Sequence, residues 1–144
     1  MNQWLDRAFL LAAGLVLTAC GSNGDGDPID RLQSSQSQVA RILCPCIEGG
    51  PDADVDECIA RGEIRDVFAC YRRVYDANTT ELDPSVSCAA DAAEQYVRCL
   101  RDLENACPGD GYQRCTDEVN ADLDACPAIP ASVAAEWNAC DPDE

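Results

Sequence analysis

The sequence predicts an all-α domain, a small disulfide-stapled helical bundle of about four to five short helices built from antiparallel hairpins. Apolar residues recur at intervals of three and four along most of the chain, which is the period of an amphipathic helix. Alternating patterns typical of strands are absent, and runs of β-branched residues are short. The chain also contains 11 cysteines, which indicates that covalent cross-links support a modest apolar core.

The first expected helix covers residues 29–43, where helically spaced residues share one face and Pro45 follows. Proline has no backbone N–H and clashes with the preceding turn, so we expect it to end this helix. The expected inward face consists of Ile29, Leu32, Gln36, Val39 and Leu43.

A second helix is expected after Gly62, and its stripe ends at residue 75. The third should begin at Asp83-Pro84-Ser85, because the first turn of a helix tolerates the missing N–H of proline. The stripes of these helices are Ile64, Val67, Phe68, Tyr71, Val74 and Tyr75, and then Cys88, Ala92, Tyr96, Cys99 and Leu103. At this spacing the aromatic side chains are expected in the core.

The last two expected helices follow turns rich in glycine and proline. Cys107-Pro108-Gly109-Asp110-Gly111 provides the turn before the fourth helix, and Pro130 with Ser132 starts a short fifth. Their stripes are Tyr112, Cys115, Val119, Leu123 and Cys126, and then Val133, Trp137 and Cys140. Together these elements define an acidic, disulfide-rich helical domain over residues 29–144.

Cysteine spacing predicts how two of the helices pair. Cys88 and Cys99 lie eleven positions apart, and so do Cys115 and Cys126. Eleven helical steps return to within about 20° of the starting face, three turns further along. An antiparallel hairpin folded about residue 107 therefore predicts the disulfides Cys88–Cys126 and Cys99–Cys115. The pattern resembles the twin Cys-motif helical hairpins of small oxidised proteins, although the cysteine interval is longer than usual in that family. The resemblance implies architecture and no shared activity.

The other cysteines leave many connectivities open. In one alternative register, Cys70 pairs with Cys88 and Cys58 pairs with Cys99. Gly62 interrupts the segment between Cys58 and Cys70, and twelve helical steps turn by about 120°, so these two thiols would diverge. The first register makes three further pairs the expected ones: Cys107–Cys140, Cys46–Cys58 and Cys44–Cys70.

The first nineteen residues predict export. Residues 8–19 form an uninterrupted run of twelve apolar or small residues, which is too short to span a bilayer and is typical of a signal peptide. The run ends in Leu17-Thr18-Ala19-Cys20, which resembles the lipobox of bacterial lipoproteins. The resemblance implies cleavage after residue 19, a diacylglycerol on the Cys20 sulfur, and acylation of the new amine, for example with palmitate.

The chain is therefore expected to have three parts: a signal peptide at 1–19, the lipidated Cys20 with a flexible tether at 20–28, and the helical domain. Gly21 rather than Asp follows the lipidated residue, and by the same resemblance this implies the outer membrane of the cell envelope, on its periplasmic face or the cell surface. Without Cys20 the remaining ten cysteines are an even number, which fits five disulfides in an oxidising compartment.

Composition excludes several functions. The chain has 10 basic residues, all of them arginine, against 27 acidic ones and no histidine, and its formal charge is −17. This charge repels nucleic-acid phosphates, and the absence of Lys and His excludes Schiff-base and histidine chemistry. We expect a membrane-anchored, non-catalytic interaction or envelope-structural module without a cofactor, whose partner is a basic protein or cations.

Two motifs suggest additional chemistry. Closely spaced thiols in Cys44-Pro45-Cys46 could exchange disulfides or bind a soft metal, which is the alternative function. No His or Lys is present to activate a thiol, so two structural half-cystines remain the expectation. The second motif partly matches a calcium loop and consists of Asp52, Asp54, Asp56 and Glu63. Glu57 occupies the place of the required glycine, so these acids are expected to cap the following helix.

Overall fold

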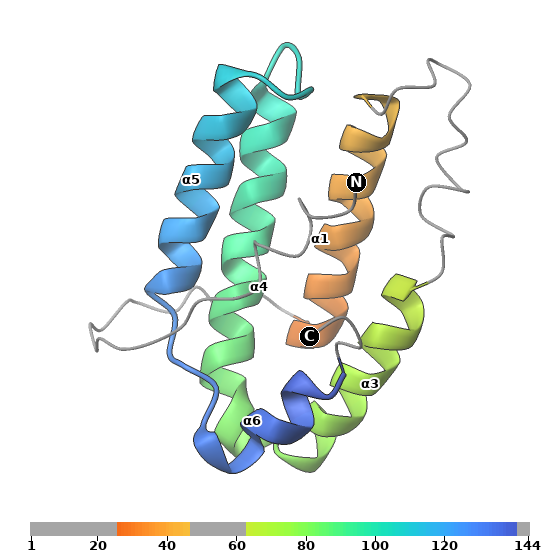
Figure 1. Ribbon diagram of the computed structural model, residues 1–144, viewed down its shortest axis with the longest axis vertical. Helices are drawn as coiled ribbons and strands as arrows, with labels where there is room; N and C mark the ends of the chain where they lie inside the picture. The colour runs from red at the N-terminus through yellow and green to blue at the C-terminus, as the bar shows by residue number, and fades with distance from the viewer. Residues whose placement is uncertain (1–25, 47–62, 141–144) are drawn as a thin grey trace.

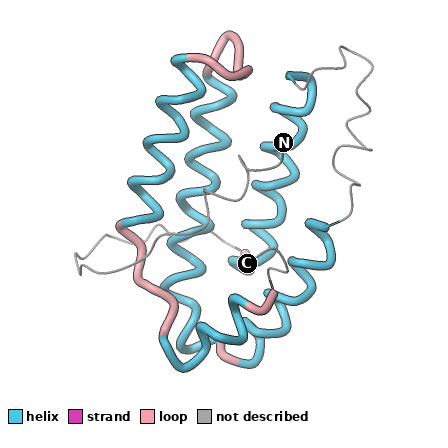
Figure 2. The backbone as a smooth tube through the Cα atoms, viewed as in Figure 1, coloured by secondary structure: helices cyan, strands magenta, loops and turns pink. Residues whose placement is uncertain are grey.

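The computed structural model describes residues 26–46 and 63–140. In these ranges the chain forms five α-helices and one 3-10 turn, without strands (Figure 2). The elements are α1 (Pro28–Leu43), η2 (Cys44–Cys46), α3 (Glu63–Ala77), α4 (Thr79–Asp102), α5 (Asp110–Asp124) and α6 (Ala131–Asn138). The predicted all-α class is confirmed. Over the same ranges, no helix has both the length and the apolar character that crossing a bilayer requires.

The longest helix, α4, lies at the centre of the bundle (Figure 1). It packs against α1 and α5, while α3 and α6 close the end at which it begins. Arg31 contacts Glu94 and Gln38 contacts Arg101, so residue numbers rise together and α1 runs parallel to α4. One disulfide joins the end of α4 to the start of α5, through Cys99 and Cys115. The other joins an earlier part of α4 to a residue just after α5, through Cys88 and Cys126. The two helices are therefore antiparallel, as predicted.

The ends of α1 follow from local sequence. The Asp27 carboxylate accepts a hydrogen bond from the backbone N–H of Ile29 at 2.9 Å, and Pro28 stands at the start of the first turn, where no N–H donor is required. At the other end, α1 stops at Leu43, and Pro45 lies in the following 3-10 turn. Both boundaries agree with the signals in the sequence to within one residue.

The buried face of α1 differs from the prediction at one position. Ser35 is only 1% exposed, whereas Gln36, the expected inward residue, is only partly buried. Ser35 lies three residues after Leu32 and four before Val39, and both of these neighbours are buried. Positions 35 and 36 therefore satisfy the helical spacing equally well, and packing against α4 decides between them.

The start of α4 also differs from the prediction. The helix begins at Thr79, so Pro84 lies inside it instead of at its start. Only Asn78 separates α3 from α4, and the Thr79 hydroxyl donates a hydrogen bond to the Tyr75 carbonyl at 3.0 Å. Burial explains the extension, because Leu82 is 0% exposed and fixes the added turn to the core. The hydrogen bond that proline cannot make falls on an exposed side, where water can replace it.

Two apolar clusters form the core. The larger joins the beginnings of α1 and α4 to α3 and α6, and consists of Ile29, Leu32, Phe68, Tyr75, Leu82, Val86, Ala90 and Val133. The smaller joins the far ends of α1 and α4 to α5, and consists of Val39, Val97, Leu100 and Cys115. The aromatic side chains serve the core as predicted: Tyr71 packs on Trp137 with ring centroids 4.5 Å apart, and both contact the larger cluster.

Two disulfides predicted from the cysteine spacing are present. Cys88 bonds Cys126 and Cys99 bonds Cys115, with Cα–Cα distances of 5.6 and 5.7 Å. The hairpin of α4 and α5 therefore has a covalent link near each end. The alternative register, which required a bond between Cys70 and Cys88, is excluded by the Cys88–Cys126 pair.

The other three expected pairs are wrong. Cys46 bonds Cys107 and Cys70 bonds Cys140, which rules out Cys107–Cys140, Cys46–Cys58 and Cys44–Cys70. The parallel orientation of α1 and α4 is the reason. It places the end of α1 beside the loop after α4, while α6 packs against α3 instead of returning to that loop. Cys44 is also disulfide-bonded, and Cys58 lies outside the described residues.

Candidate functional site

Several residues singled out in the sequence lie outside the described part of the chain. They are the lipidation candidate Cys20 with its signal peptide, and three acids of the partial calcium motif, Asp52, Asp54 and Asp56, together with Glu57 at its glycine position. The helix α3 begins at Glu63, the last acid of that motif. Within the described ranges, no group of three or more acids, cysteines or histidines is arranged to hold a metal ion.

The Cys44-Pro45-Cys46 motif is described, and it forms the turn η2 at the end of α1. The Cys46 sulfur is bonded to Cys107, and Cys44 is disulfide-bonded as well. In this oxidised form both sulfurs serve as cross-links. Neither one is a thiolate available as a nucleophile or a soft-metal ligand.

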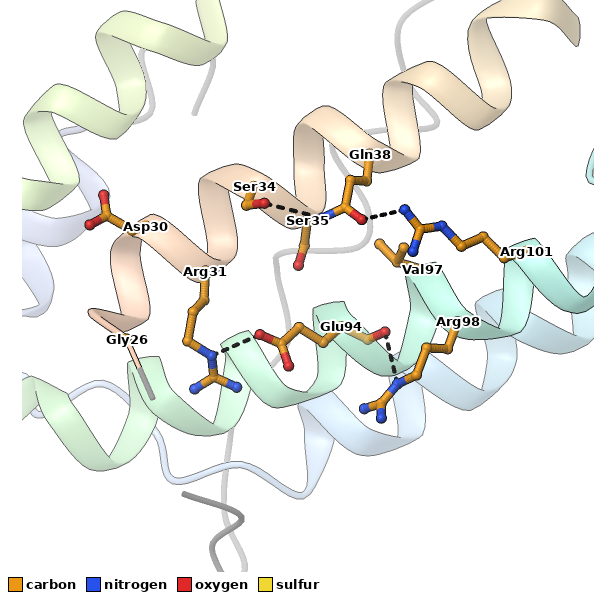
Figure 3. A pocket seen from close by; sticks show the side chains of 10 residues that line it. All are labelled: Gly26, Asp30, Arg31, Ser34, Ser35, Gln38, Glu94, Val97, Arg98 and Arg101. Carbon is orange, nitrogen blue, oxygen red and sulfur yellow. Dashed lines mark hydrogen bonds and ion pairs between the residues drawn. The ribbon is translucent and has the colours of Figure 1, made fainter. Parts of the chain in front are cut away.

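A groove between α1 and α4 is lined mainly by polar and charged side chains (Figure 3). Its volume is about 510 Å³, and side chains from both helices line it. From the α1 side it is lined by Gly26, Asp30, Arg31, Ser34, Ser35 and Gln38, and from α4 by Glu94, Val97, Arg98 and Arg101. The groove lies where α1 and α4 pass from the larger apolar cluster to the smaller one, because Ser35 sits between Leu32 and Val39.

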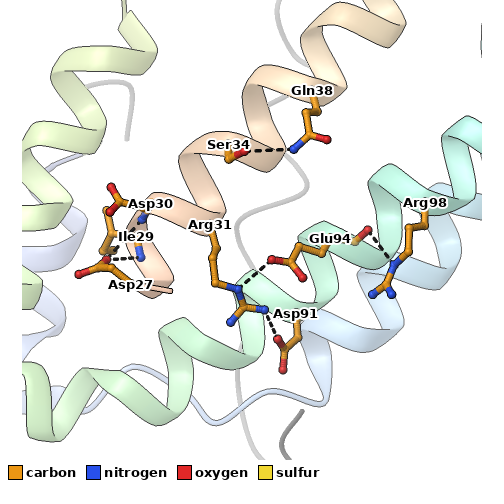
Figure 4. Close-up of polar contacts among 9 residues, drawn as sticks. All are labelled: Asp27, Ile29, Asp30, Arg31, Ser34, Gln38, Asp91, Glu94 and Arg98. Atoms are coloured by element: carbon orange, nitrogen blue, oxygen red, sulfur yellow. Dashed lines mark hydrogen bonds and ion pairs between the residues drawn. The ribbon is translucent and has the colours of Figure 1, made fainter. Parts of the chain in front are cut away.

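Arg31 holds one end of the groove in place (Figure 4). Its Nε donates a hydrogen bond to Glu94 at 2.8 Å, and Nη2 pairs with Asp91. The Arg31 side chain is only 12% exposed, so water screens these pairs less than it would at an open surface. The hydrogen bond that Arg31 donates to Glu94 raises the pKa of Arg31 above its ordinary value, although burial opposes this. Arg31 is therefore held in place and fully charged, and Glu94 and Asp91 both pair with it.

Asp30, the other acid that lines the groove, also has an arginine partner. It pairs with Arg72 of α3, which makes a second ion pair with the capping residue Asp27 at 3.1 Å. Both acids that line the groove therefore have an arginine partner. Each of the two arginines, however, is shared by two carboxylates, so these four ion pairs together keep a net negative charge.

Two arginines on the α4 side of the groove have no carboxylate partner among the described residues. Arg98 and Arg101 lie three residues apart, so they share one face of the helix. Arg101 donates a hydrogen bond to the neutral Gln38 side chain at 2.6 Å, and Arg98 donates through Nε to the Glu94 carbonyl at 3.4 Å. Within the described residues neither guanidinium forms an ion pair with a carboxylate. They give the groove local positive charge in a chain of charge −17.

The floor of the groove contains a hydroxyl without a partner. Ser35 extends from α1 into the space between the two helices (Figure 3), and its Oγ atom is buried. Among the described residues this is the one buried side-chain oxygen or nitrogen that makes no hydrogen bond. The other buried serine, Ser85, donates to the Ala128 carbonyl at 3.1 Å. A buried polar group without a partner costs about 1–3 kcal/mol, so Ser35 is unfavourable for stability as it stands.

The arrangement supports binding better than catalysis. The Ser35 hydroxyl has no base within hydrogen-bond distance, so nothing activates it as a nucleophile. Glu94 is held in an ion pair with Arg31. The groove offers two guanidinium groups, an amide and a hydroxyl, which together can recognise an anionic, polar ligand.

None of these groups was predicted from the sequence as part of a site. The pair Arg98 and Arg101 could have been noticed as two cations three residues apart in a strongly acidic chain. Ser35 could have been found from its spacing to Leu32 and Val39. Neither signal identifies a groove, because the partner helix is known only from the tertiary structure.

The fold and its site define a disulfide-stapled, acidic helical bundle with a polar groove between two parallel helices. Comparison of the chain with models of known protein families, with curated proteins and with solved structures finds no match.

Proposed function

We propose that this protein is a lipid-anchored extracytoplasmic binding module, held on the cell envelope through Cys20 and without catalytic activity of its own. The signal resembling a lipobox would supply the anchor, and the helical domain would supply the binding surface. An outer-membrane location, on the periplasmic face or the cell surface, follows from the same resemblance. The role is then to hold a partner or ligand at the membrane.

One observation carries the proposal. All nine cysteines of the described residues are disulfide-bonded. Structural disulfides of this number form and persist in exported proteins, and they are rare where thiols are kept reduced. The bonds also tie α1 to the loop after α4, α3 to the end of α6, and α4 to α5. A framework braced in this way holds a binding surface in shape outside the cell.

The outer face of α5 supports a basic partner as the macromolecular ligand. Its exposed acids outnumber its single arginine, and they are Asp110, Asp117, Glu118, Asp122 and Asp124. Such a face attracts a basic protein or cations over a distance of about 8 Å at physiological salt. Nucleic acid remains excluded as a partner by the same charge.

Mass spectrometry of the exported protein tests the proposal. The unreduced protein, purified from membranes in detergent, should begin at residue 20 and carry acyl chains. Its mass should rise by about one hydrogen for every cysteine that is released on reduction. The matched control is Cys20→Ala, which should leave the membrane fraction while retaining the same disulfides.

Two results contradict the proposal. One is a mature protein that begins elsewhere than residue 20 or carries no lipid. The other is a protein recovered from cells with its cysteines reduced, because the framework that braces the binding surface would then be absent. A reduced form with two reactive thiols at Cys44 and Cys46 would instead support the thiol–disulfide or soft-metal alternative.

A further inference from the structure

We propose that the groove between α1 and α4 binds a small hydroxylated carboxylate, such as a sugar acid. Arg98 and Arg101 would hold the carboxylate, and Ser35 with Gln38 would contact the hydroxyl groups. The inference rests on the proposed binding role and is independent of the lipid anchor. A test of ligand binding and a test of lipidation can therefore fail separately.

Charge recognition rests on the two arginines without carboxylate partners. A guanidinium presents parallel N–H donors that match the two oxygens of a carboxylate. Arg98 and Arg101 occupy one helix face, and their present hydrogen bonds go to neutral oxygens of Glu94 and Gln38. A ligand carboxylate can replace these contacts without separating an existing ion pair.

A carboxylate suits the groove better than a phosphate. Asp30 and Glu94 line the groove, and Asp91 lies beside it on Arg31. These acids are paired, but their field still opposes an incoming negative charge, as does the charge of the whole chain. A phosphate monoester carries about −1.5 to −2 charges at neutral pH, whereas a carboxylate carries one, so repulsion weighs less on the carboxylate.

The hydroxyl groups of the ligand are inferred from the floor of the groove. Ser35 is 1% exposed and has no hydrogen-bond partner, and its hydroxyl points into the space between the helices. A ligand hydroxyl that reaches the floor would supply the missing partner. Gln38 on α1 adds an amide to the lining of the groove, and Glu94 on α4 adds an acceptor (Figure 3). The volume of about 510 Å³ falls in the range typical of small-molecule sites.

Three related sugars test the proposal on the exported, oxidised protein in detergent. D-glucuronate, D-glucose and D-glucose 6-phosphate share one ring and differ at a single carbon. Each is titrated at constant ionic strength while the backbone and arginine N–H signals are followed by NMR. We expect saturable shifts with glucuronate at Arg98 and Arg101, with affinity at least about tenfold above that for glucose. Glucose 6-phosphate should bind more weakly than glucuronate.

Variants separate local contact from overall charge. Arg98→Gln and Arg101→Gln should each lower the glucuronate affinity about tenfold. Arg73→Gln changes the net charge equally on an exposed part of α3 outside the groove, and it should leave the affinity within about twofold. Ser35→Ala should lower the affinity about threefold to tenfold while the protein stays folded.

Each of the following results overturns the inference: no saturable shift with glucuronate, equal binding of glucose, tighter binding of glucose 6-phosphate, or an equal loss in Arg73→Gln. Tighter binding of the phosphate would identify the groove as a general anion site. An equal loss in Arg73→Gln would show that only long-range charge acts.

Discussion

At the scale of single residues, one buried serine should lower the free energy of unfolding and another should raise it. Ser35 on α1 is 1% exposed and has no hydrogen-bond partner, whereas Ser85 on α4 is 5% exposed and donates to the Ala128 carbonyl. Both lie within helices, so alanine gains similar helix propensity at either position. The pair therefore isolates the effect of one hydrogen bond.

We expect Ser35→Ala to raise the free energy of unfolding by about 1 kcal/mol, because it removes a buried hydroxyl that nothing satisfies. Ser85→Ala should lower it by about 1 kcal/mol, because a formed hydrogen bond is lost. Guanidinium denaturation of the oxidised proteins measures both values. A loss of stability in Ser35→Ala would show that its hydroxyl already has a partner in solution.

Tyr75 should make the free energy of unfolding depend on pH in the alkaline range. Its ring is 4% exposed, and its hydroxyl donates to Asp83 at 2.6 Å. Burial penalises the phenolate, and the bond to Asp83 favours the neutral phenol, so the pKa of Tyr75 lies well above its ordinary value. The folded state thus holds this proton more tightly than the unfolded state, in which the pKa is about 10.

The stabilisation due to the Tyr75 proton should be complete below about pH 10 and should be lost as the pH rises through the folded-state value. We expect the guanidinium concentration at the unfolding midpoint to decrease as the pH rises above about 10. In Tyr75→Phe the fall should be shallower, and part should remain because burial also raises the pKa of Tyr96. An identical pH profile in Tyr75→Phe would exclude Tyr75 as a source of the effect.

At the scale of elements, disulfides link helices that also pack against each other. The end of α1 is joined to the loop after α4 by Cys46–Cys107, which bridges 61 positions of sequence. The α4–α5 hairpin is joined internally by Cys99–Cys115, which bridges only 16. In the chain-entropy description, a longer closed loop restricts the unfolded chain more.

Removing Cys46–Cys107 with paired alanine substitutions should lower the free energy of unfolding by about 4 kcal/mol, against about 3 kcal/mol for Cys99–Cys115. Hydrogen exchange should also become faster at the C-terminal end of α1 in the first variant, because that end loses its disulfide to the loop after α4. Denaturation and exchange of the two double variants give the comparison. Unchanged protection of α1 would mean that its packing on α4 suffices without the bond.

At the scale of the whole molecule, charge and cross-links oppose each other. A chain with charge −17 repels itself when compact, and its apolar core is divided into two small clusters. Each disulfide contributes about 2–4 kcal/mol by restricting the unfolded chain, which offsets this repulsion. The same charge makes the exposed surfaces of different copies repel one another, which opposes aggregation.

Amine chemistry gives a prediction for the complete mature protein. The chain has no lysine, so if it is cleaved before Cys20, as we propose, its only amine is the new N-terminus. If that amine is acylated, an amine-reactive dye should label the protein hardly at all. The Cys20→Ala variant, which should not be lipidated, provides the labelled control. Strong labelling of the membrane form would show that the amine is free.

The sequence alone determined the all-α class, because helical periodicity follows from residue type and spacing within each segment. It also determined the α4–α5 pairing, since Cys88, Cys99, Cys115 and Cys126 repeat with the helical period on both sides of one turn. The proline stop after α1 was equally local. In each case the decisive interaction lies within one element or between neighbours along the chain.

Only the tertiary structure decided the rest. The parallel course of α1 beside α4 joins Cys46 to Cys107, and no local signal specifies it. Burial of Leu82 carries α4 through Pro84 against local propensity, and the same packing makes Ser35 the floor of a groove beside Arg98 and Arg101. These features depend on contacts between segments distant in sequence, whose free energy is set by how whole helices fit together.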